Sequence, residues 1–307
     1  MREQIKRCTP ESVKKLYRKL RSAVYSTVRP YRDAHALRAT MKLAVQKRES
    51  RTSVSDNGYY PLVCYLAAKY DSVFENFKRN FIYCQTLECA SEQEQYGFNM
   101  LKLIDNINGF NPTPEDWQDF SRNDLYGNPR TYPVTFGDRT ITISSSTIRY
   151  AKVLGEIMSM FDTDNIKTVA EVGGGYGGQC RILMSRLPIE QYTLFDLPEA
   201  LALSERFLNN YDETRNNVRY IDGGHIYAND QYDLFISNHA FAEVRREIQE
   251  IYMEKIILKS KRGYLTWNKG ADQWGGYSVQ ELLDTIHGSS RIDADRSDIC
   301  TIVWGNK

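Results

Sequence analysis

The sequence predicts a doubly wound α/β fold for the second half of the chain, preceded by an N-terminal helical segment. Two observations support this prediction. From about residue 147 onwards, short β-prone runs alternate with segments of helical periodicity, which is the pattern of a parallel sheet covered by helices on both faces. The last two β-prone runs lie too close together to be joined by a crossover helix. We therefore expect them to form an antiparallel hairpin at the end of the sheet.

The composition is that of an ordinary globular protein. The chain has 307 residues, of which 41% are hydrophobic and 26% are charged, so collagen-like, disordered and disulfide-scaffold proteins are excluded. No run of about 18 apolar residues occurs, and the first twenty residues carry Lys and Arg without an apolar core. We therefore expect neither a membrane span nor a secretory signal. The six cysteines form no C-x-x-C pair, which favours reduced thiols in a cytoplasmic protein.

The beginning of the chain is strongly basic. Residues 1–51 hold 15 of the 40 Lys and Arg residues but only 4 of the 39 Asp and Glu residues. A basic amphipathic helix is predicted over residues 11–24, with a weaker one over residues 33–48. Such a segment is expected to meet something acidic, and four partners stay open: the rest of the chain, a second subunit of a homodimer, an anionic membrane surface in peripheral contact, or a polyanion.

Three segments are expected along the chain. A polar stretch that ends in an Asn-Gly turn signal separates a basic helical arm, residues 1–55, from a mainly helical cap, residues 56–145. Within the cap, residues 59–107 are predicted to be mostly helical. Residues 109–133 are predicted to be loop-rich, because four prolines fall there. Residues 146–307 form the predicted α/β domain.

The elements of this domain follow one another in order. Helical periodicity comes first, over residues 148–158. After it, strands are predicted at 168–172, 192–195, 218–221, 232–237 and 263–267, helices at 201–208, 245–260 and 278–287, and the hairpin at 290–295 and 299–304.

A glycine cluster, EVGGGYGGQ over residues 171–179, follows the first predicted strand. It leads into a helix that is expected to begin near Gln179. Glycines let the backbone approach a ligand closely at the N-terminus of a helix. Asp196 ends the next strand, where a carboxylate can accept hydrogen bonds from ribose hydroxyl groups. Together, these features predict a site for an adenosine-containing cofactor at the carboxyl edge of the sheet.

Two classes of cofactor fit this site. Gly173, Gly175 and Gly178 satisfy the G-x-G-x-x-G pattern of dinucleotide-binding proteins. An acidic residue two positions before the first glycine is instead typical of methyltransferases that use S-adenosyl-L-methionine (SAM), and Glu171 occupies that position. The mid-chain place of the motif and the C-terminal hairpin favour SAM. A nicotinamide or flavin cofactor is the alternative, as is a glycine turn that serves packing alone.

Several motifs resemble one family. The segments EVGGGYGGQ, FDLPE, SNHAFAE and RGYLTWN, together with the upstream pieces DNGYYP, FENFKRN, GNP and STIRY, are similar to the sugar O-methyltransferases of bacterial polysaccharide loci. The resemblance covers roughly residues 55–270. It implies a class I, Rossmann-like SAM-methyltransferase fold and methyl transfer to a sugar hydroxyl group, with a nucleotide sugar or a surface-polysaccharide intermediate as acceptor. His239 departs from the family pattern, in which an aromatic residue such as Tyr is expected there.

The resemblance and the order of the elements suggest which residues hold the cofactor. Glycines of the cluster should line its methionine and ribose portion, Asp196 should bind the ribose, and Leu197 should lie against the adenine. Asp222 is placed to reach the adenine amino group, and Arg149 is suited to pair with the methionine carboxylate through its guanidinium group. Helix capping, a turn or a surface ion pair are the structural alternatives. The candidate cofactor-binding residues are Glu171, Gly173, Gly175, Tyr176, Asp196, Leu197, Asp222, Ser237, Asn238, Arg149 and Tyr150.

A sugar hydroxyl group is a weak acid, so its methylation calls for a base or a metal ion. The candidate bases are His239, Glu243 and His225, two of which carry an imidazole that titrates near neutral pH. Asn268 ends the fifth strand, where it either binds the acceptor or caps the following turn. No ligand spacing calls for a metal ion, so none is predicted.

Other functions are weighed against this one. A nucleic-acid methyltransferase would use the basic arm to follow phosphates, but nucleic acid is not expected as a partner. A methyltransferase for a phenol or an amine is a second alternative, and a non-catalytic scaffold with the same fold is a third. Aromatic residues in loop-like segments could frame a carbohydrate, although each is more often found in a core; they are Tyr126, Tyr132, Trp117, Trp274 and Tyr277.

Overall fold

The computed structural model describes residues 59–80, 82–84, 93–226, 230–293 and 298–306. The expected basic arm at residues 1–55, with its two predicted helices, lies outside these ranges.

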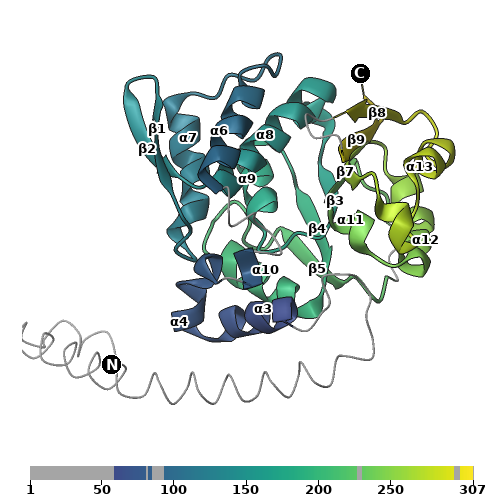
Figure 1. Cartoon of the computed structure of the whole chain (residues 1–307), viewed down its shortest axis with the longest axis horizontal. Helices are drawn as coiled ribbons and strands as arrows, with labels where there is room; N and C mark the ends of the chain where they lie inside the picture. Colours follow the sequence, from purple (N-terminus) through teal and green to yellow (C-terminus); the bar gives the residue numbers. More distant parts are fainter. Residues whose placement is uncertain (1–58, 81, 85–92, 227–229, 294–297, 307) are drawn as a thin grey trace, which may run out of the picture.

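A seven-stranded sheet with the order β5-β4-β3-β6-β7-β9-β8 forms the centre of the molecule (Figure 1). The strands from β3 to β7 are parallel, whereas β9 is antiparallel to both β7 and β8. The doubly wound α/β fold with its C-terminal antiparallel hairpin is therefore confirmed. The strands are β3 (Thr168–Val172), β4 (Gln191–Asp196), β5 (Val218–Asp222), β6 (Leu234–Asn238), β7 (Gly263–Asn268), β8 (Ser290–Asp293) and β9 (Ile299–Trp304).

Helices cover both faces of the sheet. Figure 1 shows α8 and α9 on one side of the strands and α11, α12 and α13 on the other. Neighbouring strand residues alternate between two hydrophobic cores: Val169 belongs to the first core and Ala170 to the second. Both faces are therefore buried, as in other parallel sheets. The helices are α8 (Ser145–Met160), α9 (Gly178–Arg186), α10 (Pro198–Leu208), α11 (Ala240–Glu243), α12 (Arg246–Lys255) and α13 (Val279–Thr285).

The described residues before α8, from Tyr59 onwards, pack onto the α8–α10 side and share its hydrophobic core. The first hydrophobic core contains side chains from both segments, among them Phe77 and Trp117 together with Leu154 and Leu183. The segment consists of α3 (Tyr59–Lys69), α4 (Asp71–Phe74), the 3-10 turn η2 (Phe77–Arg79), α6 (Gln93–Ile104), α7 (Pro114–Phe120), the 3-10 turn η3 (Ser121–Leu125), β1 (Tyr132–Phe136) and β2 (Arg139–Ile143).

Two features of this cap differ from the sequence prediction. Residues 109–133, which were expected to be loop-rich, contain α7 and η3. The reason is that Thr113 and Asp116 form a capping box and Pro114 occupies the first helical turn, where a proline starts a helix instead of breaking it. In addition, β1 and β2 form an antiparallel hairpin. Its sequence signal is the alternating run from Tyr132 to Ile143 around a Gly-Asp turn.

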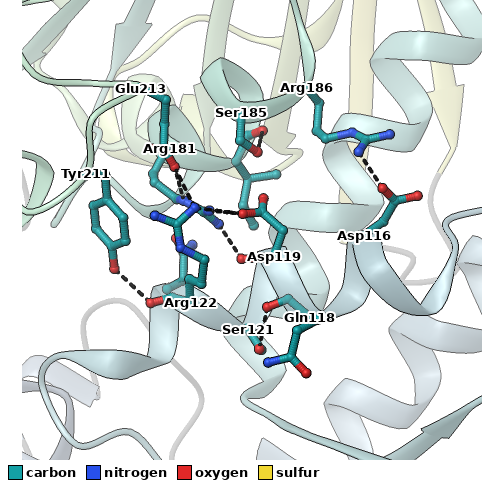
Figure 2. A network of polar contacts seen from close by, with 12 residues as sticks. Asp116, Gln118, Asp119, Ser121, Arg122, Arg181, Ser185, Arg186, Tyr211 and Glu213 are labelled. Atoms are coloured by element: carbon teal, nitrogen blue, oxygen red, sulfur yellow. Dashed lines mark hydrogen bonds and ion pairs between the residues drawn. The ribbon is translucent and has the colours of Figure 1, made fainter. Parts of the chain in front are cut away.

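A buried arginine joins the cap to α9 (Figure 2). The side chain of Arg181 is fully buried and donates to the carbonyl and the carboxylate of Asp119, at 2.7 and 2.5 Å, and to the carboxylate of Glu213 at 3.0 Å. Arg122 pairs with the same two carboxylates. Burial raises the pKa of Asp119. The charge of Arg181 and the hydrogen bonds from both arginines lower this pKa by more than burial raises it, so the net shift is downward.

Across the described ranges of the chain, no helix combines the length and apolar character that crossing a bilayer requires.

Candidate active site

The strand order reverses between β3 and β6, and in such sheets ligands bind at this switch point, outside the carboxyl ends of the strands. The glycine bend, residues 173–177, leaves β3 at this point and leads into α9. Gly173, Gly175 and Gly177 have φ angles of +81°, +58° and +88°, a region that side chains rarely adopt. A Cβ atom on Gly173 would lie 1.9 Å from that of Ala240, directly after β6. The two loops at the switch point therefore approach each other too closely for any side chain at Gly173.

Asp196 lies against the glycine bend at the end of β4. Its Oδ2 atom accepts a hydrogen bond from the N–H of Gly175 at 2.9 Å, and its Oδ1 atom accepts one from the N–H of Leu197 at 2.7 Å. A carboxylate has about four acceptor positions, so about two are left for a ligand such as a ribose diol. Burial raises the pKa of Asp196 to about 6, while the two N–H groups lower it and the charge of Glu243 raises it.

Glu243 and His239 come after β6, on the other side of the switch point. Since the charge of Glu243 acts on Asp196, these two carboxylates lie within electrostatic range of each other. Nδ1 of His239 is 3.1 Å from Oδ1 of Asn268, at the end of β7. An amide oxygen only accepts hydrogen bonds, so Nδ1 of His239 is the donor of this pair, and in the neutral form of the imidazole Nε2 carries the lone pair.

The backbone of His239 is strained. Its φ angle is +70°, which is uncommon for a residue other than glycine and costs of order 1–3 kcal/mol. The backbone N–H of His239 donates a hydrogen bond to the carbonyl of Thr266 at 3.1 Å. Strained residues of this kind cluster at active sites, because the surrounding structure over-determines their position.

Ser237 and Asn238 have different roles at the end of β6. Ser237 is fully buried, and its hydroxyl group donates to the carbonyl of Val172 at 2.9 Å and accepts from the N–H of Phe241 at 3.0 Å. It therefore fixes α11 to β3. Asn238 accepts from the hydroxyl group of Thr266 at 3.3 Å, but its buried Nδ2 atom has no acceptor among the described residues. An unsatisfied buried donor costs about 1–3 kcal/mol, so Nδ2 marks a place where an oxygen atom of a ligand fits.

Three predicted cofactor residues, Glu171, Tyr176 and Tyr150, place their side chains in the core beside the glycine bend. Glu171 is 2% exposed and accepts a hydrogen bond from the hydroxyl group of Tyr192 at 2.8 Å. Burial raises its pKa to about 7, although that hydrogen bond and the charge of Arg149 lower it. The ring of Tyr176 is 1% exposed and lies edge-on to the ring of Tyr150. A cofactor would therefore meet Tyr176 through its backbone.

Asp222 and His225 lie on the far side of Asp196. Asp222 ends β5 and pairs in register with Asp196. Its carboxylate accepts from the N–H of Gly224 at 3.0 Å and lies 3.0 Å from Nδ1 of His225. Three strand spacings, about 14 Å, separate β5 from β6. The structure thus places His239 and Glu243 after the same strand, β6, and places His225 after β5, three strands away.

Three residues on which the charge of Asp196 acts, Tyr60, Cys64 and Tyr252, were not assigned to the site from the sequence, although Tyr252 and Gln249 also carry the family resemblance. Tyr60 and Cys64 of α3 are buried, and the charge of Asp196 is one cause of their raised pKa values, after burial. Tyr252 of α12 packs its ring against Phe195 and places its hydroxyl group 3.4 Å from the carbonyl of Gly223. The motif DNGYYP, which carries part of the family resemblance and contains Tyr60, was a sequence signal that could have indicated this residue. The aromatic residues considered as a sugar platform include two that are buried in the core, Trp117 and Tyr277.

No group of three or more His, Cys, Asp or Glu residues within the described ranges is arranged to hold a metal ion. The donors at the switch point fit an adenosine cofactor instead. Asp196 offers acceptors for a ribose, Asn238 offers an unused donor, and the glycine bend provides backbone without side chains. These groups fit an adenosine-containing cofactor such as SAM.

Comparison with known proteins supports this assignment. Residues 140–236 match the sequence model of an O-methyltransferase domain, about a third of the chain. The match includes the candidate residues from Arg149 to Asp222 and ends directly before Ser237. No curated protein matches the chain in sequence.

Among solved structures, the methyltransferase domain of bacterial CtHen1 is 14% identical, with a TM-score of 0.40 over 51% of this chain and 96% of that one. The mitomycin 7-O-methyltransferase MmcR is 11% identical, with a TM-score of 0.38 over 94% of this chain and 98% of that one. The YcgJ protein of Bacillus subtilis is 13% identical, with a TM-score of 0.36 over 46% and 70%.

The matched domain and the donor set at the switch point lead to the same conclusion. The chain is a methyltransferase that takes SAM as its methyl donor, and its residues 140–236 are similar to an O-methyltransferase domain.

Proposed function

We propose that this methyltransferase acts on a hydroxyl group of a sugar, in a nucleotide sugar or an intermediate of surface-polysaccharide assembly. The matched domain supports an oxygen acceptor. The motifs shared with the sugar O-methyltransferases of bacterial polysaccharide loci support a sugar. The observation that carries the proposal is the pair formed by His239 and Asn268, because a weakly acidic hydroxyl group needs a base fixed in one orientation.

Each residue at the switch point has a defined task in this proposal. SAM, when bound, supplies a methyl group that is activated by a positively charged sulfur. Asp196 orients the ribose through its remaining acceptor positions, and Nδ2 of Asn238 donates to an oxygen atom of the cofactor or the acceptor. Nε2 of His239 would take the proton of the acceptor hydroxyl group as its oxygen atom receives the methyl group.

Glu243 supports the base in this proposal. Glu243 ends the short helix α11, which begins directly after His239, and a nearby carboxylate stabilises the imidazolium that forms when the proton arrives. Its position within electrostatic range of Asp196 also adds negative charge near a cofactor that carries a positive sulfur. Glu243 thus favours both cofactor binding and proton transfer.

Methyl transfer to a panel of acceptors tests the proposal. The protein is incubated with methyl-labelled SAM and with nucleotide sugars, oligosaccharides, phenols and amines, and products are identified by mass spectrometry. We expect a labelled methyl ether on a sugar. Methylation confined to a phenol or an amine would contradict the sugar assignment while leaving the methyltransferase assignment intact.

Two variants test the base. His239→Ala should lower kcat by about 100-fold or more, since general-base catalysis contributes about 10²–10⁴-fold. Glu243→Gln should lower kcat less. The affinity for S-adenosylhomocysteine (SAH), the demethylated product of SAM, should stay within a few-fold of wild type for His239→Ala. His287→Ala, at an exposed position after α13, is the matched control and should keep the wild-type rate. An unchanged kcat for His239→Ala would place the base elsewhere.

A further inference from the structure

The cap buries a lysine beside the glycine bend. Lys78, in η2, is 2% exposed. Its ammonium group donates to the carbonyl of Asn123 at 2.6 Å and lies 4.0 Å from the centroid of the Tyr176 ring. The rings of Phe207 and Phe77 are 5.1 and 5.7 Å away. Three aromatic rings therefore surround a buried positive charge.

This ammonium group contacts the cofactor loop by two routes. The first is direct, because Tyr176 is part of the glycine bend. The second passes through Asn123, whose backbone carbonyl accepts from Lys78 and whose Nδ2 atom donates to the carbonyl of Gly178 at 3.0 Å. Gly178 is the first residue of α9, directly after the bend. Lys78 therefore contacts the bend in the middle and, through Asn123, at its end.

Attachment of the cap does not by itself account for a buried charge here. Arg181 joins α7 to α9, and Arg206 of α10 joins α3 and α4 to the domain, donating to the carbonyls of Ala67 and Ala68 at 3.1 and 3.2 Å and pairing with Asp71 at 2.6 Å. A buried ammonium costs several kcal/mol of desolvation, which an apolar side chain of the same length would avoid. The charge of Lys78 acts on the buried carboxylate of Asp124, whose pKa it lowers against the effect of burial. In addition, Lys78 makes a cation–π contact with a ring of the cofactor loop.

We propose that Lys78 is a positioning residue of the methyl transfer, which holds the glycine bend in the conformation that binds the cofactor. It acts through the Tyr176 ring and through Asn123, and it touches neither cofactor nor acceptor. The proposal rests on the cofactor site and is independent of the nature of the acceptor. It also gives the motif FENFKRN, which contains Lys78, a role in cofactor binding.

Calorimetric titration with SAH tests the proposal on the full chain. Lys78→Met keeps the length of the side chain and removes the charge, and we expect it to raise the Kd for SAH at least tenfold. Lys78→Arg keeps the cation and should recover part of the affinity. Arg206→Met is the matched control, because it removes a cation that joins the cap to the domain away from the bend. It should leave the Kd within twofold of wild type.

A second variant decides the question if Lys78→Met does not fold. Asn123→Ala keeps the backbone carbonyl that accepts from Lys78 but removes the hydrogen bond to Gly178, and it should raise the Kd several-fold. A folded Lys78→Met protein with the wild-type Kd would overturn the proposal. So would an Arg206→Met protein weakened as much as Lys78→Met, because cap attachment in general would then be the cause. If the wild-type protein does not bind SAH, the assignment of the cofactor site is wrong, which contradicts both the proposed function and the proposed role of Lys78.

Discussion

Glu171 and Asp196 are carboxyl groups near the switch point, with pKa values raised to about 7 and about 6. Burial is the main cause in both cases, because it disfavours the charged form. The sequence indicated both residues by their positions relative to the glycines and the strand end. It could not indicate their environments, because the hydrogen bond from Tyr192 to Glu171 and the N–H groups around Asp196 depend on how the chain folds.

The raised pKa of Glu171 makes stability depend on pH. Its pKa is about 4.5 in the unfolded chain and about 7 in the folded one, so its contribution is most favourable below about pH 4.5 and is lost as the pH rises through 7. Glu171→Gln keeps an acceptor for Tyr192 and removes the charge. We expect this variant to be more stable than wild type at pH 8, by up to about 3 kcal/mol, with a smaller difference at pH 5. Urea unfolding at both pH values measures this. A variant that is less stable than wild type at pH 8 would contradict it.

The raised pKa of Asp196 makes cofactor affinity depend on pH. Its charged form accepts hydrogen bonds from ribose hydroxyl groups, and protonation near pH 6 replaces an acceptor by a donor. We therefore expect the Kd for SAH to rise about tenfold between pH 8 and pH 5. Asp196→Asn should bind weakly at both pH values, with a flatter profile. The same steep profile in Asp196→Asn would assign the titration to another group.

At the scale of elements, the sequence predicted the strands of the main sheet but missed α7, η3 and the β1–β2 hairpin of the cap. Apolar runs bounded by turns predicted β3, β4, β6, β7 and β9, because these strands are largely buried and leave a strong local pattern. The half-buried β5 and the exposed β8 were predicted from short β-prone runs. The cap was harder to predict. Pro114 suggested a loop, although the capping box of Thr113 turns it into the start of α7, and the hairpin of β1 and β2 has exposed positions that weaken its signal.

The approach of the glycine bend to the loop after β6 gives a prediction for one element. Gly173→Ala adds a Cβ atom that would lie 1.9 Å from the Cβ atom of Ala240, at a φ angle of +81°. We expect a loss of about 2 kcal/mol or more in the free energy of unfolding, and a Kd for SAH raised at least tenfold. Thermal unfolding and calorimetry measure both effects.

Gly275→Ala is the control for this variant. Gly275 has a similar φ angle of +83°, but nothing lies within 4 Å of an added Cβ atom. It should share the backbone strain, about 1–2 kcal/mol, and keep the wild-type affinity for SAH. Equal affinities for the two variants would show that the contact between the two loops does not shape the cofactor site.

At the scale of the whole molecule, contacts between residues far apart in the sequence join the cap to the α/β domain. Arg181 meets Asp119 and Glu213, and Lys78 meets Asn123 and Tyr176. Local periodicity carries no information about such pairs. The sequence therefore indicated the glycine bend and Asp196, but it indicated neither the buried Lys78 nor the arginine cluster, which consists of Arg122 and Arg181 with Asp119 and Glu213.

The arginine cluster of Figure 2 predicts a large effect on stability. Arg181→Met removes a fully buried cation and leaves the carboxylates of Asp119 and Glu213 with Arg122 alone. We expect a loss of about 3 kcal/mol in the free energy of unfolding, measured with urea. Arg139→Met removes the exposed pair with Glu115 and should cost less than about 1 kcal/mol. Similar losses for both variants would contradict a special role of Arg181.

The most direct measurement is calorimetric titration of the wild-type chain and of Asp196→Ala with SAH and, separately, with NAD, at pH 8. We expect wild type to bind SAH with one site per chain and not to bind NAD, and the variant to lose at least tenfold in affinity for SAH because the ribose loses its acceptor. Binding of NAD by wild type in place of SAH, or an unchanged affinity for SAH in Asp196→Ala, would contradict a SAM site at the switch point of this sheet.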